Sequence, residues 1–222
     1  MKKLTLPLLG VLAMLASCSE APKADSASTG AADSVAAATG TAFTVDTSSS
    51  LVNWVGTKQT GQHMGTFKLA DGSFSVADGN ITGGSFTINV ASLAVTDLTG
   101  EEKGQLEGHL SSPDFFDAAK YPSARFDITG VAPYDSATTK SLLAGATHVI
   151  SGNLKLKDST VNISFPAKVQ LAGNSLSAEA DFNIDRTQWG MNYKGPNNPQ
   201  DWFIKKEVNL KLNLKANSAA AQ

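Results

Sequence analysis

The chain has 222 residues and a mass of 23.1 kDa, which is room for one sizeable domain or two small ones, and one domain is the better prediction. Its formal net charge of -2 and pI near 5.9 provide no basic surface for a phosphate backbone and argue against nucleic-acid binding. The single Cys argues against a disulfide scaffold. The 19 Gly residues, spread among many Thr, Ser, Asn and Val, favour a turn-rich β protein.

The first residues have the features of a bacterial export signal. A lysine pair precedes an apolar stretch, Leu4–Leu15, which is shorter than the ~20 residues needed to cross a bilayer. The segment Leu15–Cys18 resembles the lipobox of bacterial lipoproteins, and this resemblance implies removal of residues 1–17 and acylation of Cys18. Ser19 favours sorting to the outer membrane, with the domain in the periplasm or at the cell surface.

The residues that follow are predicted to form a flexible linker, so that residues 18–42 comprise the acylated Cys and this linker. Ala, Ser, Thr and Gly dominate the segment, and it contains no aromatic residue. Such a composition cannot bury enough apolar surface to offset the entropy lost on ordering. An Ala-rich helix is the alternative, and the interspersed Gly, Ser and Thr argue against it. A flexible coil of this length spans roughly 25 to 30 Å.

From Phe43 onward, apolar residues recur at every second position in short runs, each typical of a strand with one face toward an apolar core. The runs are Phe43 and Val45; Val52 and Trp54; Phe67 and Leu69; Phe74 and Val76; Phe86, Ile88 and Val90; Ile150, Leu154 and Leu156; Val161, Ile163 and Phe165; Leu176, Ala178, Ala180, Phe182 and Ile184; and Val208, Leu210, Leu212 and Leu214. Hairpin turns are predicted at Asp71–Gly72, Asp78–Gly79, Lys157–Ser159 and Gly173–Asn174. About eight or more antiparallel strands predict closure into a barrel or a two-sheet sandwich.

One helical segment interrupts the strands. Thr99 and Glu102 fit a capping box, and the box introduces a predicted helix over Lys103–Leu110. A turn follows at Pro113–Asp117, where two adjacent aromatic residues are predicted to form a plug or lid over one end of the sheet. A helix that only covers a sheet edge fits the pattern equally well.

The sequence contains no recognisable catalytic, metal-binding or cofactor-binding motif. His63, His109 and His148 lie far apart, and no pair has the spacing of zinc ligands. There is neither a Gly-x-Ser-x-Gly elbow nor a Gly-rich phosphate loop between a strand and a helix. Asp114 and Asp117 are acids near a helix terminus, where such residues usually interact with the helix dipole. We therefore predict no catalytic residue, no metal site and no cofactor.

Several motifs resemble the YceI-like family. They are His63–Phe67, Ser92–Leu93, Leu106–Asp117, Tyr121–Phe126, Gly152–Leu154, Phe182–Gly190 and Val208–Leu210. They follow one another in the family's order and cover nearly all of Phe43–Lys215. The most specific is the pattern His-Leu-x-Ser-x-Asp-Phe-Phe-Asp, which begins at His109.

The resemblance implies an all-β fold, a lipocalin-like antiparallel eight-stranded barrel with a short helical insertion. The barrel domain is expected over residues 43–215, followed by a disordered tail over 216–222. The resemblance also implies a lumen that binds a long amphiphile, typically a polyisoprenoid or an isoprenoid quinone. An eight-stranded barrel is wide enough either to be filled by its own side chains or to hold one slender ligand, and the sequence leaves both outcomes open.

Candidate ligand-binding residues fall into two groups. The lumen or lid group is Trp54, Phe67, Phe86, Phe116 and Trp189, and the polar group at the mouth is His63, His109 and Arg186. Each aromatic residue could instead belong to the packed core. The structural alternatives for the polar group are a loop-fixing hydrogen bond for His63, a helix cap for His109 and an ion pair with Asp185 or another acid for Arg186.

The function predicted from these features is that of an exported lipoprotein whose barrel sequesters or transports a long-chain lipid beside a membrane. Its expected partners are this lipid and the membrane that holds its N-terminal anchor, and a homodimer is left open. Two other classes of function remain open: an enzyme acting on such a lipid, and an interaction module of the cell envelope that binds no ligand.

Overall fold

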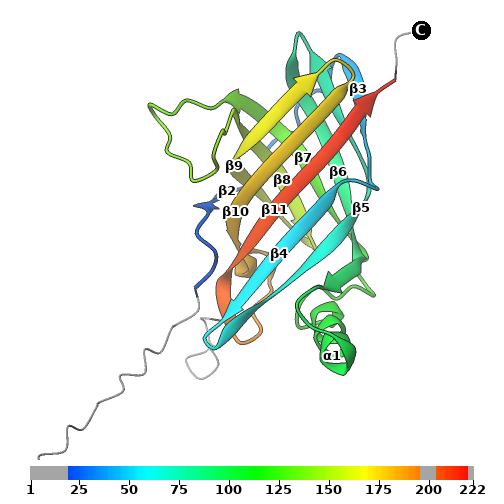
Figure 1. Ribbon diagram of the computed structural model, residues 1–222, viewed down its shortest axis with the longest axis vertical. Helices are drawn as coiled ribbons and strands as arrows, with labels where there is room; N and C mark the ends of the chain where they lie inside the picture. The colour runs from blue at the N-terminus through cyan, green and yellow to red at the C-terminus, as the bar shows by residue number, and fades with distance from the viewer. Residues whose placement is uncertain (1–19, 196–203, 220–222) are drawn as a thin grey trace, which may run out of the picture.

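The computed structural model of the chain describes residues 20–195 and 204–219 (Figure 1). The predicted signal peptide and Cys18 lie outside the described residues. Within the described residues, no helix is both long enough and apolar enough to cross a membrane.

The described chain is dominated by one antiparallel sheet that closes on itself. Its strands are β3 (Thr41–Val45), β4 (Leu51–Lys58), β5 (Gly61–Ala77), β6 (Asn80–Val95), β7 (Ser123–Pro133), β8 (His148–Leu156), β9 (Ser159–Ala172), β10 (Ser175–Asp185) and β11 (Ile204–Ser218). Strands β3 and β4 both pair with β5 and β11, so together they occupy one position in the wall. Strand β10 pairs with both β9 and β11 and closes the ring. The predicted eight-stranded barrel with a short helical insertion is thereby confirmed.

Alternation along the strands builds the core. The inward-facing residues are almost all buried, and Ile163 and Phe182 are each only 1 % exposed. The predicted period-two runs therefore identify the inner face correctly, because one face of a closed sheet has no access to water. Strand β7 was not predicted from alternation, since its inward face begins with the small residue Ala124 before Phe126 and Ile128.

The predicted turn at Asp71–Gly72 is wrong. Strand β5 continues through these residues, and its register with β6 shifts between Leu69 and Asp71. Gly72 faces Phe86 closely enough that an added Cβ would lie 2.8 Å from the Phe86 Cβ. The glycine therefore serves a bulged strand with a close neighbour rather than a hairpin. The other predicted hairpin turns each join two neighbouring strands of the ring.

Helix α1 (Gly100–Ser111) lies under one end of the barrel (Figure 1). Thr99 occupies the N-cap position, but its side chain makes no capping hydrogen bond. Glu107 instead accepts a hydrogen bond of 2.8 Å from the Val95 N–H, which ties the helix to the end of β6. A short 3-10 helix, η1 (Arg186–Trp189), follows β10 at the same end of the barrel.

The segment predicted to be a flexible linker is instead bound to the strands of the barrel. Strands β9 and β10 pair only at Lys168–Ala172 and Ser175–Glu179, and they separate beyond this stretch. Two short strands fill the split: β1 (Asp25–Ser26) pairs with β10 at Phe182 and Asn183, and β2 (Ser28–Gly30) pairs with β9 at residues 162–164. The N-terminal segment thus completes the wall where the direct ladder ends.

Further along, the same segment crosses the neighbouring strands. The Asp33 N–H donates to the Asn153 side chain at 3.0 Å, and the Asn153 amide donates back to the Asp33 carbonyl at 2.7 Å. The Ala36 N–H then donates to the Ile128 carbonyl at 3.2 Å. Backbone hydrogen bonds rather than apolar burial order this segment, which is why a prediction based on side-chain hydrophobicity alone failed here.

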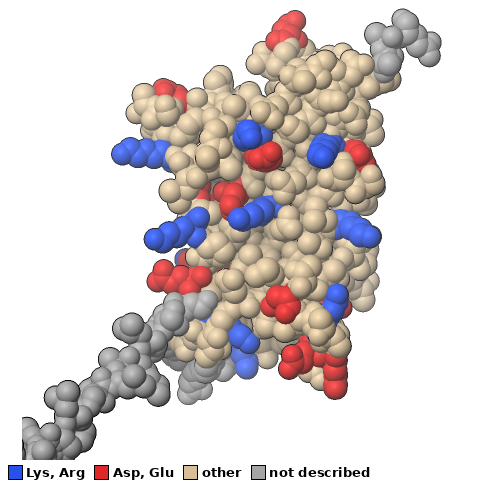
Figure 2. Space-filling model, in the orientation of Figure 1, with Lys and Arg blue, Asp and Glu red and all other residues tan. Residues whose placement is uncertain are grey.

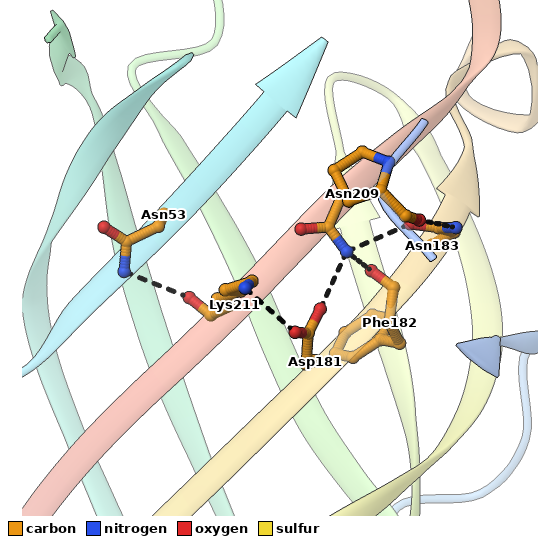
Figure 3. A network of polar contacts seen from close by, with 7 residues as sticks. Asn53, Asp181, Phe182, Asn183, Asn209 and Lys211 are labelled. Carbon is orange, nitrogen blue, oxygen red and sulfur yellow. Dashed lines mark hydrogen bonds and ion pairs between the residues drawn. The ribbon is translucent and has the colours of Figure 1, made fainter. Parts of the chain in front are cut away.

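A polar network on β10 and β11 joins the wall to this segment (Figure 3). The fully buried Asn209 donates to Asp181 at 2.8 Å and to the Asn183 side chain at 3.0 Å. Asn183 in turn donates to the Pro22 carbonyl at 3.1 Å, and Lys211 pairs with Asp181 at 3.1 Å. At the other end of the chain, β11 runs to Ser218, so the strand extends beyond the predicted domain boundary at residue 215.

We predict that the amides of Ala27, Asp33 and Ala36 exchange with solvent deuterium about tenfold or more slower than in an unstructured peptide, because each is hydrogen-bonded. Asn153→Ala should release the Asp33 amide and leave the Ala27 amide protected, and hydrogen-exchange NMR measures both. Exchange of all three amides at the rate of a free coil would contradict the packed arrangement.

Candidate functional site

An apolar cavity of about 200 Å³ occupies the half of the barrel that lies nearer α1. Its wall is formed by aliphatic side chains from strands all around the ring, including Val52, Ile88, Leu154, Ile184 and Leu210. The cavity is partly open to solvent, and its lining is almost wholly apolar. Such a space suits a slender hydrocarbon chain, because the chain brings no polar group that would need a partner from this lining.

Most of the predicted site residues converge on this cavity. Those that line it are Trp54, His63, Phe67, His109, Phe116 and Arg186. Phe86 and Trp189 do not line it. Phe86 stacks on Phe126 with ring centroids 5.2 Å apart, and Trp189 is fully buried and donates its indole N–H to the Leu154 carbonyl at 2.9 Å. Both belong to the packed core, which was their structural alternative.

The Pro113–Asp117 turn forms part of the cavity's cover. Phe115 and Phe116 both line the cavity, and the Phe116 ring meets Phe67 edge-on with centroids 5.2 Å apart. Phe115 also contacts His109, whose ring lies 4.7 Å from that of Tyr193. This arrangement matches the predicted plug rather than a helix that only covers an edge. Through the His109–Tyr193 contact, α1 packs against the segment that follows η1.

The ionisable side chains that line the cavity all belong to basic residues. Lys58 and Lys205 line the cavity together with Arg186 and the two His residues, and among the described lining residues none is Asp or Glu. An anion on a guest molecule would therefore meet the cationic side chains of Lys58, Lys205 and Arg186 at this end and no carboxylate among the described lining residues.

Two acids hold the His rings from outside the lining. His63 Nδ1 lies 2.9 Å from Asp97 Oδ2, and His109 Nε2 lies 3.1 Å from Asp114 Oδ2. Partial burial would raise the pKa of Asp97, but hydrogen bonds from the Met64 N–H and from His63 outweigh it and lower the pKa below its ordinary value. Asp97 is thus a carboxylate at neutral pH that fixes the His63 ring at the mouth.

Arg186 supports the mouth without a carboxylate partner. Its side chain is 3 % exposed and donates hydrogen bonds to the carbonyls of Tyr193 at 3.0 Å, Ile204 at 3.2 Å and Lys205 at 3.1 Å, and to that of Met191. Burial lowers the pKa of the guanidinium, and the nearby Asp185 opposes this shift. The structural alternative for Arg186, an ion pair with Asp185 or another acid, is not observed in the described chain, and the Asp185 carboxylate pairs with Lys206 at 3.3 Å.

Two buried polar atoms among the lining residues have no hydrogen-bond partner in the described chain. They are Trp54 Nε1 and Thr57 Oγ1, on residues that are 7 % and 1 % exposed. The indole lies flat against β5, where a Cβ on Gly65 would be 2.5 Å from Trp54 Cζ2. Both atoms are enclosed by the surrounding protein, and leaving such a buried group unpaired costs ~1–3 kcal/mol.

Sequence reasoning missed several residues of the mouth. These residues are Thr57, Lys58 and Lys205, and they lie near strand ends. At the end of β4, three consecutive residues, 56–58, all line the cavity. Alternation therefore gave no signal for them. Among the described residues, no group of three or more His, Cys, Asp or Glu could hold a metal ion.

The chain belongs to the YceI-like domain family, whose model matches residues 43–216. The fold is similar to that of BcnA from Burkholderia cenocepacia, with 22% identity, a TM-score of 0.61 and coverage of 78% of this chain and 99% of that one. It is also similar to a polyisoprenoid binding domain from Saccharophagus degradans implicated in plant cell wall breakdown, with 20% identity, a TM-score of 0.58 and coverage of 81% and 99%. No curated protein matches the chain.

We predict that Thr57→Val raises the free energy of unfolding of the ligand-free protein by about 1 kcal/mol, because the variant no longer buries an unpaired hydroxyl. Chemical denaturation of the delipidated protein measures the change. Thr57→Ser keeps the hydroxyl and serves as the control, with no such gain. A loss of stability in the Val variant would show that the hydroxyl is already satisfied.

Proposed function

We propose that the protein binds a long-chain amphiphilic lipid, such as a polyisoprenoid or an isoprenoid quinone, and that it sequesters or transports this lipid as an exported lipoprotein. The observation that carries the proposal is the apolar cavity inside the barrel, which is partly open to solvent and has Lys58, Lys205 and Arg186 among its lining residues. Membership of a family with a polyisoprenoid-binding structural neighbour supports it further.

The hydrophobic effect would drive binding, because the hydrocarbon tail moves from water into the apolar cavity. At ~0.8 kcal/mol per buried CH₂, about ten buried carbons supply ~8 kcal/mol, from which the cost of immobilising the guest must be subtracted. The face of the barrel shown in Figure 2 carries charges of both signs dispersed among uncharged residues, whereas the cavity lining is almost wholly apolar. The interior is therefore the favoured place for the hydrocarbon.

The head group would bind at the mouth. Lys58 and Lys205 line the cavity and can attract an anion, or donate to an acceptor, at its edge. A carbonyl, carboxylate or phosphate head group fits these donors. Release would be passive, since a bilayer offers the tail an equally apolar environment.

The proposed anchor would hold the domain near the membrane surface. Described contacts of the N-terminal segment begin at Pro22, so at most about 14 Å of extended chain separates Cys18 from the barrel wall. Figure 1 shows the described chain beginning beside the half of the barrel where α1 lies. This placement supports a mouth that faces the membrane, within reach of lipid.

To test lipid binding, the full chain is isolated and weighed by native mass spectrometry before and after organic extraction. We expect the untreated protein to carry a stoichiometric adduct of lipid size. Ala124→Leu, which fills the cavity, should lose the adduct. Ala178→Leu, which enlarges an inward residue away from this cavity, should keep it. Equal masses before and after extraction of the wild type would contradict the proposal.

To test anchoring, wild type and Cys18→Ser are expressed with the complete N-terminal sequence and fractionated. The wild type should sediment with membranes and begin at an acylated Cys18, because two or more acyl chains anchor a protein stably. The Ser variant should appear in the soluble fraction with its barrel still folded. An unmodified Cys18 in the mature wild type would refute the lipoprotein assignment, and the proposal that the barrel binds lipid would be unaffected.

A further inference from the structure

A row of four phenylalanine rings crosses the inside of the barrel. Phe86 stacks on Phe126 with centroids 5.2 Å apart, Phe126 lies 5.9 Å from Phe165, and Phe165 stacks on Phe182 at 4.0 Å with an interplanar angle of 9°. Each of the four residues is at most 4 % exposed. They come from β6, β7, β9 and β10, so the row extends along much of the ring.

The row separates two apolar spaces. On β7, Ala124 lines the cavity near α1 and Ile128 lines a second, smaller space of about 30 Å³, with Phe126 between them. On β10, Ile184 and Ala180 stand in the same relation on either side of Phe182. The four rings therefore form a partition on this side of the bore, whereas on β11 the successive inward residues Leu210 and Leu212 line one space each.

The wall is built to hold the partition in place. Strand β8 lies between the strands of Phe126 and Phe165, and its Gly152 pairs with Ile128 on one side and Ile163 on the other. A Cβ on Gly152 would lie 2.2 Å from the Phe126 Cζ, so the ring occupies the space that any other residue would fill. Glycine inside a strand often marks such a close approach.

We infer that this partition is a floor that limits the length of tail the cavity accepts, an inference that rests on the proposed lipid binding. From Phe182 at the floor to Arg186 at the mouth, β10 advances four residues, or ~13 Å along the strand and ~10 Å along a barrel axis tilted at about 40°. An extended chain advances ~1.1 Å per bond. Roughly ten chain carbons therefore fit above the floor.

The ligand class that follows is an amphiphile whose buried part is about ten chain carbons long. A longer tail must fold back or leave its end outside, unless the floor rings move. Removing a ring would join the two spaces and let a longer tail continue toward Ile128 and Ala180.

The test is a series of straight-chain fatty acids, shorter and longer than about ten carbons, that compete with a fluorescent fatty acid for the full-length protein. For the wild type, affinity should rise about fourfold per added methylene up to that length and then level off, because further methylenes are not buried. Phe126→Ala should move the plateau to longer chains by several carbons. Phe43→Ala, which removes a buried ring that belongs to neither the floor nor either cavity lining, should leave the plateau unchanged.

Thermal melting of each variant establishes that it is folded, and Phe126→Leu replaces the Ala variant if the latter is not. Affinity that keeps rising with chain length in the wild type would overturn the floor while leaving lipid binding intact. An unchanged plateau in a folded Phe126 variant would overturn it as well. Failure of every fatty acid to displace the probe would contradict the proposed function itself, and the floor with it.

Discussion

Closure of the hydrogen-bonded wall is the constraint on which the rest of this structure depends. A sheet that closes on itself puts every second side chain into an interior without water, and that interior must be filled by side chains or by a guest. Here the direct ladder between β9 and β10 covers only part of their length, and β1 and β2 complete it. The N-terminal segment is therefore part of the wall, although the matching family model begins only at residue 43.

Within the closed wall, side-chain size divides the interior into a packed region and a cavity. Phenylalanines pack together across the middle and stabilise the barrel, whereas smaller residues such as Ala124 and Ile184 leave the half near α1 unfilled. The lining of a cavity forgoes van der Waals contacts that a packed core would have, and a bound tail would supply such contacts in this space of about 200 Å³.

The sequence was informative wherever a single local pattern determines structure. Alternation identified inward residues such as Phe67 and Leu210, and the family motifs placed His63, His109 and Arg186 at one end of the barrel. It failed where the outcome depends on a distant partner. Gly72 is a bulge rather than a turn because Phe86 lies opposite, and Arg186 is solvated by backbone carbonyls that no side-chain pattern reveals. The N-terminal segment was mispredicted for the same reason, since its backbone bonds to strands far along the chain.

The central claim is that a hydrocarbon tail occupies the cavity above the phenylalanine row. Its most direct test is a crystal structure of the delipidated protein with a fatty acid brominated at the end of its tail, in which anomalous scattering locates the bromine. The account predicts one bromine peak inside the barrel, in contact with residues such as Ile88, Leu154 and Ile184. A peak confined to the outer wall, or a cavity that stays empty while the fatty acid binds elsewhere, would contradict it.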